Sequence, residues 1–325
     1  MKSINMGKKS QKKTRYTAPF VSICTPTFNR RPFIPGIIQC VKNQDYPKNK
    51  IEWVILDDGS DKIEDLVKHI PYVKYIKVEN KMHLGKKRNF IHEHCIGDII
   101  VYMDDDDYYP PTRISHAVKK LIDNPKALCA GASELYVYFK HINELWQFGP
   151  YGTNHATAGT FAFKKQLLEV TRYNDTKALA EEKEFLKDYS IPFVQLEPKD
   201  TILVFSHNHN TFDKKKLLIN PNPKVTKKSD KSIEYFVKEK DLYDFFINID
   251  EALKDYEPGL PKNKPDVLEQ TKQLEKAREE KMKNTDLNTI LNNFNNDILN
   301  LKKDMINMNN MLGNLKQELK DKNII

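Results

Sequence analysis

Residues 101–111 read Val-Tyr-Met-Asp-Asp-Asp-Asp-Tyr-Tyr-Pro-Pro and combine an apolar run with four consecutive aspartates. The apolar run that ends at Met103 is rich in β-branched and aromatic residues, which predicts a buried strand. The carboxylates of residues 104–107 follow at the carboxyl end of that strand, where open α/β sheets bind ligands. Four adjacent negative charges repel one another unless a positive charge offsets them, and a hard divalent cation with oxygen ligands can do so.

The geometry of an extended chain also suits a cation at this place. Alternate residues of a strand point the same way, so Asp104 and Asp106 can face one ion. The alternative is a solvated acidic turn that begins the next helix. For an isolated acidic run that alternative would be the better interpretation, so the rest of the chain must decide.

Strand and helix patterns alternate between residues 19 and 130. We expect strands over residues 20–24, 51–56, 73–78 and 98–103, and helices over residues 31–43, 63–69, 85–93 and 111–123. This alternation predicts an α/β fold with a doubly wound, mainly parallel sheet. The pattern is mixed further on, where we expect strands over 135–139, 160–163, 193–196 and 202–205 and helices over 177–189 and 233–253.

Composition and sequence patterns together predict that the chain has four parts. These are a disordered basic tail over residues 1–15, the α/β domain over 16–210, a helical extension and linker over 211–262, and a coiled-coil helix over 263–325. The tail holds six Lys and Arg residues and no acid, so it carries six of the eight net positive charges. The remaining body has little charge excess, and we expect no nucleic-acid partner.

The last part shows a heptad pattern. Its apolar residues alternate in steps of four and three and are Leu287, Leu291, Phe294, Ile298, Leu301, Met305, Met308, Leu312, Leu315 and Leu319. Such a seam predicts a coiled coil, and we favour self-association into a homo-oligomer through residues 287–319. Packing of one long helix back on the body is the alternative.

The four cysteines lie far apart without paired spacing, which argues against a zinc knuckle and favours a reducing compartment. No window is apolar enough to span a bilayer, and the basic N-terminus lacks the apolar run of a secretory signal. We therefore expect a soluble, cytoplasmic protein.

Three predicted strands end in polar residues suited to a nucleotide, at 25–30, 57–60 and 104–107. Asp58 could accept hydrogen bonds from a base or a ribose, and Phe28 could stack on a base. Arg88, with Lys86 and Lys87, could meet phosphate oxygens at a helix start. Taken singly, an Asp-Gly turn and a solvated helix face explain these residues equally well.

The order and spacing of four motifs resemble the family 2 glycosyltransferases of the GT-A fold. The motifs are Ser-Ile-Cys-Thr-Pro-Thr-Phe-Asn-Arg at 22–30, Val-Ile-Leu-Asp-Asp-Gly-Ser at 54–60, Gly-Lys-Lys-Arg-Asn at 85–89 and Met-Asp-Asp-Asp-Asp-Tyr-Tyr-Pro at 103–110. The resemblance is clear over residues 19–125, thinner to residue 210, and ends there. It implies a GT-A-like domain that takes a nucleotide-sugar donor, with UDP as the expected nucleotide.

The resemblance also implies roles for single residues. It assigns the nucleotide to Pro26, Thr27, Phe28, Asp57, Asp58, Arg88, Asp104 and Asp105, with Lys86 as an alternative to Arg88 for the diphosphate. It makes Asp106, with Asp104, the ligand of Mn²⁺ or Mg²⁺. From the sequence itself, His207 or His209 could complete the metal site after the strand at 202–205, and we favour His209.

The family's catalytic base is an acid in a Glu-Asp pair on a later helix. The matching pair here is Glu181-Glu182, so the resemblance implies Glu182 as the base and Glu181 as its alternative. A carboxylate is suited to take the proton of an acceptor hydroxyl during attack. The resemblance implies transfer with inversion to the hydroxyl of a glycan, protein or small molecule. The Gln-x-x-Arg-Trp element of processive synthases is absent, which favours transfer of a single sugar.

Two other functions fit parts of the pattern. A sugar-phosphate nucleotidyltransferase would also use a doubly wound sheet and a metal, but it needs a Gly-rich loop after the first strand, and residues 25–30 contain no glycine. An inactive transferase-like scaffold that oligomerises through its C-terminal helix is the second alternative.

Overall fold

The structure is a computed structural model that describes residues 17–179 and 182–322, without the side chains of Arg278 and residues 281–290. It divides into two units, with the boundary between Leu268 and Glu269. The predicted basic tail and Glu181 lie outside the described residues.

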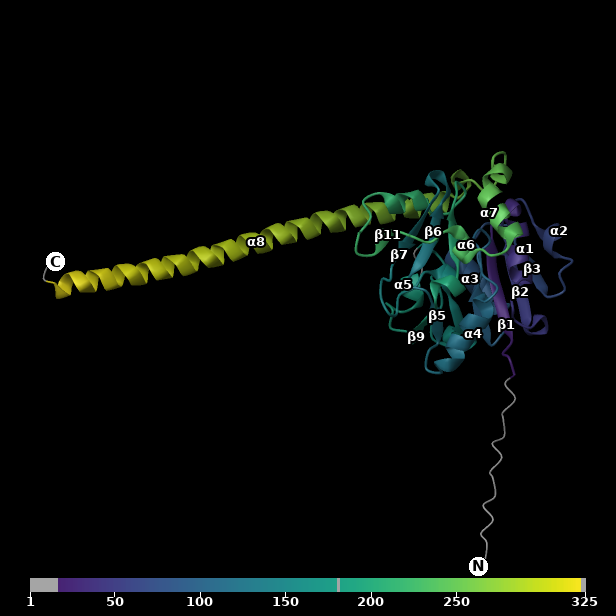
Figure 1. Cartoon of the computed structure of the whole chain (residues 1–325), viewed down its shortest axis with the longest axis horizontal. Helices are drawn as coiled ribbons and strands as arrows, with labels where there is room; N and C mark the ends of the chain where they lie inside the picture. Colours follow the sequence, from purple (N-terminus) through teal and green to yellow (C-terminus); the bar gives the residue numbers. More distant parts are fainter. Residues whose placement is uncertain (1–16, 180–181, 323–325) are drawn as a thin grey trace, which may run out of the picture. The chain divides into compact units, whose positions relative to one another are not determined.

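A seven-stranded sheet forms the centre of the first unit (Figure 1). Its strands, from one edge to the other, are β3 (Val73–Lys77), β2 (Ile51–Asp57), β1 (Val21–Thr27), β4 (Ile99–Tyr102), β8 (Ala162–Lys164), β5 (Cys129–Gly131) and β9 (Phe193–Gln195). Neighbouring strands are parallel except for β8, which is antiparallel to β4 and β5. The predicted mainly parallel α/β sheet is confirmed.

Both faces of the sheet are covered, as a doubly wound fold requires. Ile23 packs in one core with α1 (Ile34–Lys42) and α4 (Arg113–Asp123), and α2 (Glu64–Val67) contributes Val67 to the same core. Its neighbour Cys24 points into the other core, with α3 (Leu84–Glu93) and α5 (Glu182–Phe185). Because successive residues of a strand point to opposite faces, a strand buried on both sides is an almost continuous apolar run.

A second sheet was not predicted. It has the order β10 (Leu203–Ser206), β6 (Leu135–Phe139), β7 (Glu144–Phe148) and β11 (Thr226–Lys228). Tyr108, directly after the acidic run, exchanges two backbone hydrogen bonds with Leu203, of 2.9 and 3.0 Å. The acidic run is therefore bound at its end to the first residue of β10.

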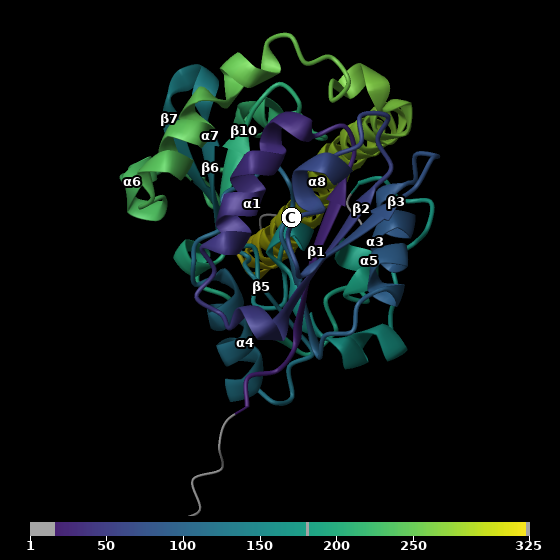
Figure 2. The same cartoon turned by 90° about the vertical axis from the view of Figure 1, so that its right-hand side faces the viewer.

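Residues 233–253 form two helices, α6 (Ile233–Phe236) and α7 (Lys240–Leu253), where one was predicted. Helix α7 lies against α1 (Figure 2). The Phe245 ring covers Gly36 so closely that a Cβ there would lie 2.3 Å from it. Ile249 and Leu253 pack with Phe33 beside it. This part of the extension thus belongs to the first unit.

The helix predicted over residues 177–189 is wrong in extent, because α5 covers only Glu182–Phe185. Lys187, Asp188 and Tyr189 have φ values between 48° and 62°. A right-handed helix cannot continue through left-handed residues, so the chain turns away there.

Helix α8 (Pro265–Asp321) is 57 residues long and begins with proline, which is suited to a first turn. The predicted C-terminal helix is confirmed. Large apolar side chains are exposed along it from Leu291 to Leu315. Within the part of the chain that the structure describes, we find no helix with the length and apolar character needed to cross a membrane.

His92 gives the first unit a testable dependence on pH. It is buried, and its Nε2 lies 2.6 Å from the Tyr102 hydroxyl. Burial, with a contribution from Arg88, lowers the pKa of His92 to about 3. Between that pH and ~6.5, the ordinary histidine pKa, only the unfolded chain takes up this proton. Stability is therefore present above pH ~6.5 and is lost as the pH falls, by up to about 1.4 kcal/mol per unit.

We expect His92→Gln to flatten the loss of unfolding free energy between pH 6.5 and pH 4.5, measured by urea denaturation. His94→Gln, at the end of the same helix, is the control and should leave the slope unchanged. Equal slopes for wild type and His92→Gln would contradict this account.

Candidate functional site

The carboxyl ends of β1, β2 and β4 meet at one edge of the sheet, as predicted. Thr27 pairs in register with Asp57, and Cys24 pairs with Tyr102. The Thr25 hydroxyl donates to the carbonyl oxygen of Met103 at 2.6 Å, which ties the end of β1 to the residue before the acidic run. The polar segments after these three strands therefore lie next to one another.

Arg30 is the buried counter-ion of the acidic run. Its Nε lies 3.6 Å from Asp105 Oδ1, and an Nη atom lies 3.2 Å from Asp106 Oδ2. The other Nη atom donates to the carbonyl oxygen of His209 at 2.7 Å. Sequence reasoning missed this role, although an arginine directly after the first polar turn was the available signal.

The acids of the run differ in their pKa values. Burial raises the pKa of Asp105 to about 7 and that of Asp107 to about 8. Burial also disfavours charge on Asp106, but Arg30 and His207 outweigh it and hold the pKa of Asp106 well below its usual range. Asp107 accepts the backbone N–H of Phe205 at 3.1 Å. Of the three buried acids Asp105, Asp106 and Asp107, Asp106 is thus the one held in the charged form.

The structure brings His207 to the acidic run. Its Nε2 lies 3.3 Å from Asp106 Oδ2, and burial lowers its pKa to about 3, so the ring is neutral. The favoured candidate, His209, is also buried, but its ring stacks on Tyr256 with centroids 6.0 Å apart. Only its carbonyl reaches the site, through Arg30.

The donor chemistry around Asp106 fits a divalent cation. A charged carboxylate beside a neutral imidazole suits Mn²⁺, and oxygen ligands suit Mg²⁺. Among the residues that the structure describes, no group of three or more His, Cys, Asp or Glu side chains has metal-binding geometry. The acidic run would therefore need donor groups from a bound ligand or water to complete a coordination shell.

Asp58 forms a buried ion pair with Lys87, which also donates to the carbonyl oxygen of Thr27 at 3.3 Å. The second carboxylate oxygen of Asp58 accepts a hydrogen bond from the backbone N–H of Met82 at 2.7 Å. The ammonium groups of Lys81 and Lys87 lie 5.3 and 5.8 Å from the centre of the Phe28 ring. The predicted nucleoside residues Phe28 and Asp58 therefore lie around one lysine.

Asp57 is engaged in holding its own loop. It accepts hydrogen bonds from the backbone N–H groups of Gly59 and Ile63 and from the Tyr75 hydroxyl, at 2.7–3.0 Å. Pro26 lies within β1 beside Leu56. The loop after β2 is thus fixed from within by the first of its two aspartates.

Arg88 lies between two aromatic rings, 4.6 Å from the centre of Tyr102 and 5.3 Å from that of Tyr173. It donates to the Tyr173 hydroxyl at 3.3 Å and is buried. Lys86 is exposed. Of the three basic residues, Lys87 is the one whose ammonium reaches the loops after β1 and β2.

Glu182 is the first residue of α5 and is partly buried. Its Oε1 lies 3.5 Å from the backbone nitrogen of Ala158. The next residue, Gly159, lies against Asp104, because a Cβ there would be 2.9 Å from Asp104 Oδ2. Glu182 and Asp104 thus flank one short turn, η4 (Ala158–Thr160). Buried Arg113 holds this turn through the carbonyl oxygen of Thr160 at 2.8 Å.

Residues 254–268, which we call the strap, contact several loops of this edge. The Tyr256 hydroxyl donates to Asp61 at 2.8 Å, and the carbonyl oxygen of Pro258 accepts from Asn29 at 3.1 Å. Asp266 pairs with Lys81 and lies 3.3 Å from His83. The end of the predicted helical extension and linker over 211–262 lies within the strap, which therefore forms part of this site.

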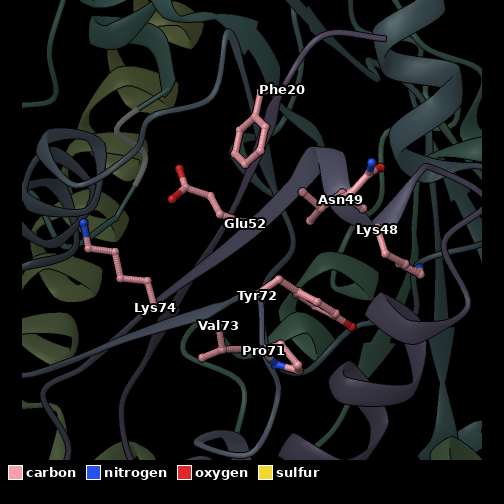
Figure 3. A pocket seen from close by; sticks show the side chains of 9 residues that line it. Phe20, Lys48, Asn49, Glu52, Pro71, Tyr72, Val73 and Lys74 are labelled. Atoms are coloured by element: carbon pink, nitrogen blue, oxygen red, sulfur yellow. The ribbon is translucent and has the colours of Figure 1, made fainter.

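A cavity of about 650 Å³ lies elsewhere (Figure 3). Its lining includes Ile51 and Glu52 at the start of β2 and Val73 at the start of β3. The cavity therefore lies at the amino ends of parallel strands, whereas the acidic run lies at their carboxyl ends.

The Asp58–Lys87 pair predicts a large effect of substitution. Lys87→Met leaves a buried carboxylate without its cation, and we expect a loss of about 3–5 kcal/mol in unfolding free energy. Asp58→Asn combined with Lys87→Met removes both charges and should recover much of that loss, measured by urea denaturation. Lys86→Met, at the exposed neighbour, is the control. A double variant no more stable than Lys87→Met would contradict the pairing.

Comparison with known proteins finds a family model that matches part of the chain. Residues 22–174 match the family described as Glycosyl transferase family 2. The poly(ribitol-phosphate) β-N-acetylglucosaminyltransferase TarS of Staphylococcus aureus is 30% identical over 92 residues, which cover 27% of this chain and 16% of TarS. The putative colanic acid biosynthesis glycosyl transferase WcaA of Escherichia coli is 32% identical over 102 residues, which cover 30% and 36%.

Among solved structures, a mannosyltransferase of Pyrobaculum calidifontis in complex with GDP-Man and Mn²⁺ superposes with a TM-score of 0.47 at 19% identity. The superposition covers 57% of each chain. The matches with TarS and WcaA leave most of both proteins uncovered.

Proposed function

Because residues 22–174 belong to glycosyl transferase family 2, we propose that this protein transfers a single sugar from a nucleotide-sugar donor to an acceptor hydroxyl. One observation carries the proposal. The acidic run lies where β1, β2 and β4 end, with Asp106 held in its charged form between Arg30 and His207. An acidic turn in solvent would not be buried against a guanidinium and an imidazole.

The donor is a UDP-sugar in this proposal. Phe28 stacks on the base, and Asp58 accepts a hydrogen bond from it with a lone pair that Lys87 and Met82 leave available. Lys87 balances the charge of Asp58 and holds the β1 and β2 loops together. The Staphylococcus relative, whose described activity transfers N-acetylglucosamine, makes UDP-N-acetylglucosamine the first donor to test.

Asp106 and His207 hold Mn²⁺ or Mg²⁺ in this proposal, with Asp104 or Asp105 beside them. A bound cation offsets the charge that develops on the departing diphosphate. Arg30 keeps Asp106 ionised at neutral pH, so this carboxylate is ready to bind a cation. The raised pKa values of Asp105 and Asp107 limit the negative charge that the run carries before ligands bind.

Glu182 is the proposed general base. Its carboxylate lies beside the backbone nitrogen of Ala158, and the next residue, Gly159, lies against Asp104. The base and the acidic run therefore approach the same turn, η4. It accepts the proton of the acceptor hydroxyl while that oxygen attacks the anomeric carbon. Attack from the face opposite the diphosphate inverts the configuration.

Donor hydrolysis tests the activity without knowledge of the acceptor. Wild-type protein with Mn²⁺ should release UDP slowly from a UDP-sugar, and Asp106→Asn should abolish both the release and the effect of Mn²⁺ on donor binding. We expect Glu182→Gln to bind donor normally but to react ~10²–10⁴-fold more slowly. Glu184→Gln, exposed on the same helix, is the control. Unchanged hydrolysis in both site variants would contradict the assignment.

We also propose that α8 associates with a second copy of itself. Along the predicted seam, Leu291, Phe294, Leu301, Met305 and Met308 are 51–64% exposed in the single chain. A coiled coil buries such residues against identical ones.

Truncation after Leu268 retains the strap and should convert an oligomer into a monomer in light scattering. Donor binding should be unchanged by the truncation. If the truncated and full-length proteins have the same number of chains per particle, self-association through α8 is contradicted. Truncated protein that binds no donor would instead favour a role for α8 in the site.

A further inference from the structure

Lys264 is a buried cation with no carboxylate partner of its own. It lies directly before α8 and is 4% exposed. Its ammonium donates to the Thr211 hydroxyl at 3.3 Å, and it forms no ion pair with any of the described residues. Burial and the nearby Arg30 lower the pKa of Lys264 to about 6. A buried charge without a counter-ion is costly, so its retention calls for a reason.

The charges around Lys264 are those of the candidate site. Arg30, Asp105, Asp106 and Lys87 are the groups that act on it electrostatically. Arg30 is already paired with Asp105 and Asp106, and Lys87 is already paired with Asp58. Among the described cations of this group, Lys264 is thus the one that has no acidic partner.

The strap holds Lys264 in place from both sides. On one side, Asn29 donates to the carbonyl oxygen of Pro258, and Gly259 lies so close to Asn29 that a Cβ there would be 2.6 Å from its backbone oxygen. On the other side, Asp266 pairs with Lys81. The backbone N–H of Lys264 also donates to the carbonyl oxygen of Pro261 at 2.9 Å. The position of its ammonium is therefore built into the fold.

We propose that Lys264 binds the diphosphate of the nucleotide-sugar donor and stabilises the nucleoside diphosphate as it leaves. The inference rests on the proposed function and extends the donor site to a residue 90 positions beyond the family match. A diphosphate brings the negative charge that Lys264 lacks, and ammonium–phosphate hydrogen bonds are among the stronger ones in proteins. Sugars and nucleosides without phosphate carry no such charge.

The step balances without a further reactant. The acceptor oxygen forms a bond to the anomeric carbon as the bond from that carbon to the phosphate oxygen breaks. The electron pair of the broken bond stays on the diphosphate, next to Lys264, and the acceptor proton goes to Glu182. The negative diphosphate favours the protonated form of Lys264, whose charge offsets the charge that develops on the leaving group.

Binding of UDP and of uridine to Lys264→Met tests the proposal. We expect ~10–100-fold weaker binding of UDP than in wild type, by calorimetry with Mn²⁺ present, and unchanged binding of uridine, by ligand-observed NMR. Lys264→Arg should restore part of the UDP affinity. Lys262→Met, two residues away on an exposed lysine paired with Glu257, is the matched control and should bind like wild type.

Stability separates this role from a structural one. Lys264→Met replaces a buried amine that has no counter-ion, so the ligand-free variant should unfold at the same or a higher temperature than wild type. A lower melting temperature, or equal UDP affinity in Lys264→Met and wild type, would overturn the inference while leaving the proposed function intact. Wild-type protein that binds no nucleoside diphosphate at all would overturn the proposed function and this inference together.

Discussion

The buried contact of Arg30 with Asp105 and Asp106 is the interaction on which the site depends. It joins three parts of the chain, because the same guanidinium also binds the carbonyl oxygen of His209 beyond β10. Without it, burial would favour the neutral form of both Asp105 and Asp106. The arrangement is costly in desolvation, as is usual where ionised groups are gathered for binding or chemistry.

The site uses two buried ion pairs for two different purposes. At Asp106 the cation comes from a loop after β1, and the carboxylate keeps its charge beside a neutral imidazole. At Asp58 the cation is Lys87 on α3, which fastens that helix to the loops after β1 and β2. One pair prepares a charge for a ligand, and the other fixes the walls around it. Removal of either cation would leave a buried carboxylate without compensation.

The sequence predicted the first half of the fold well, because strands buried on both faces read as apolar runs and amphipathic helices follow each of them. It also predicted that the segments after β1, β2 and β4 converge. The second sheet was missed, although strands over 135–139 and 202–205 were predicted, because β10 and β11 pair with β6 and β7 from far along the chain. The favoured histidine differs from the one beside Asp106 because the chain turns after His207, where the backbone N–H of Asn210 donates to the His207 carbonyl oxygen, and the pattern alone does not reveal that turn.

The contributions of Arg30 and Lys264 depend on contacts across the chain that no local pattern encodes. The strap illustrates this best, since its residues read as a Pro- and Lys-rich connection yet pack against Asn29, Asp61 and Lys81. The functional unit is accordingly larger than its family signature. A polypeptide ending at residue 174 or 210 would keep every recognisable motif and still lack the contacts that brace Asn29, Asp61 and Lys81.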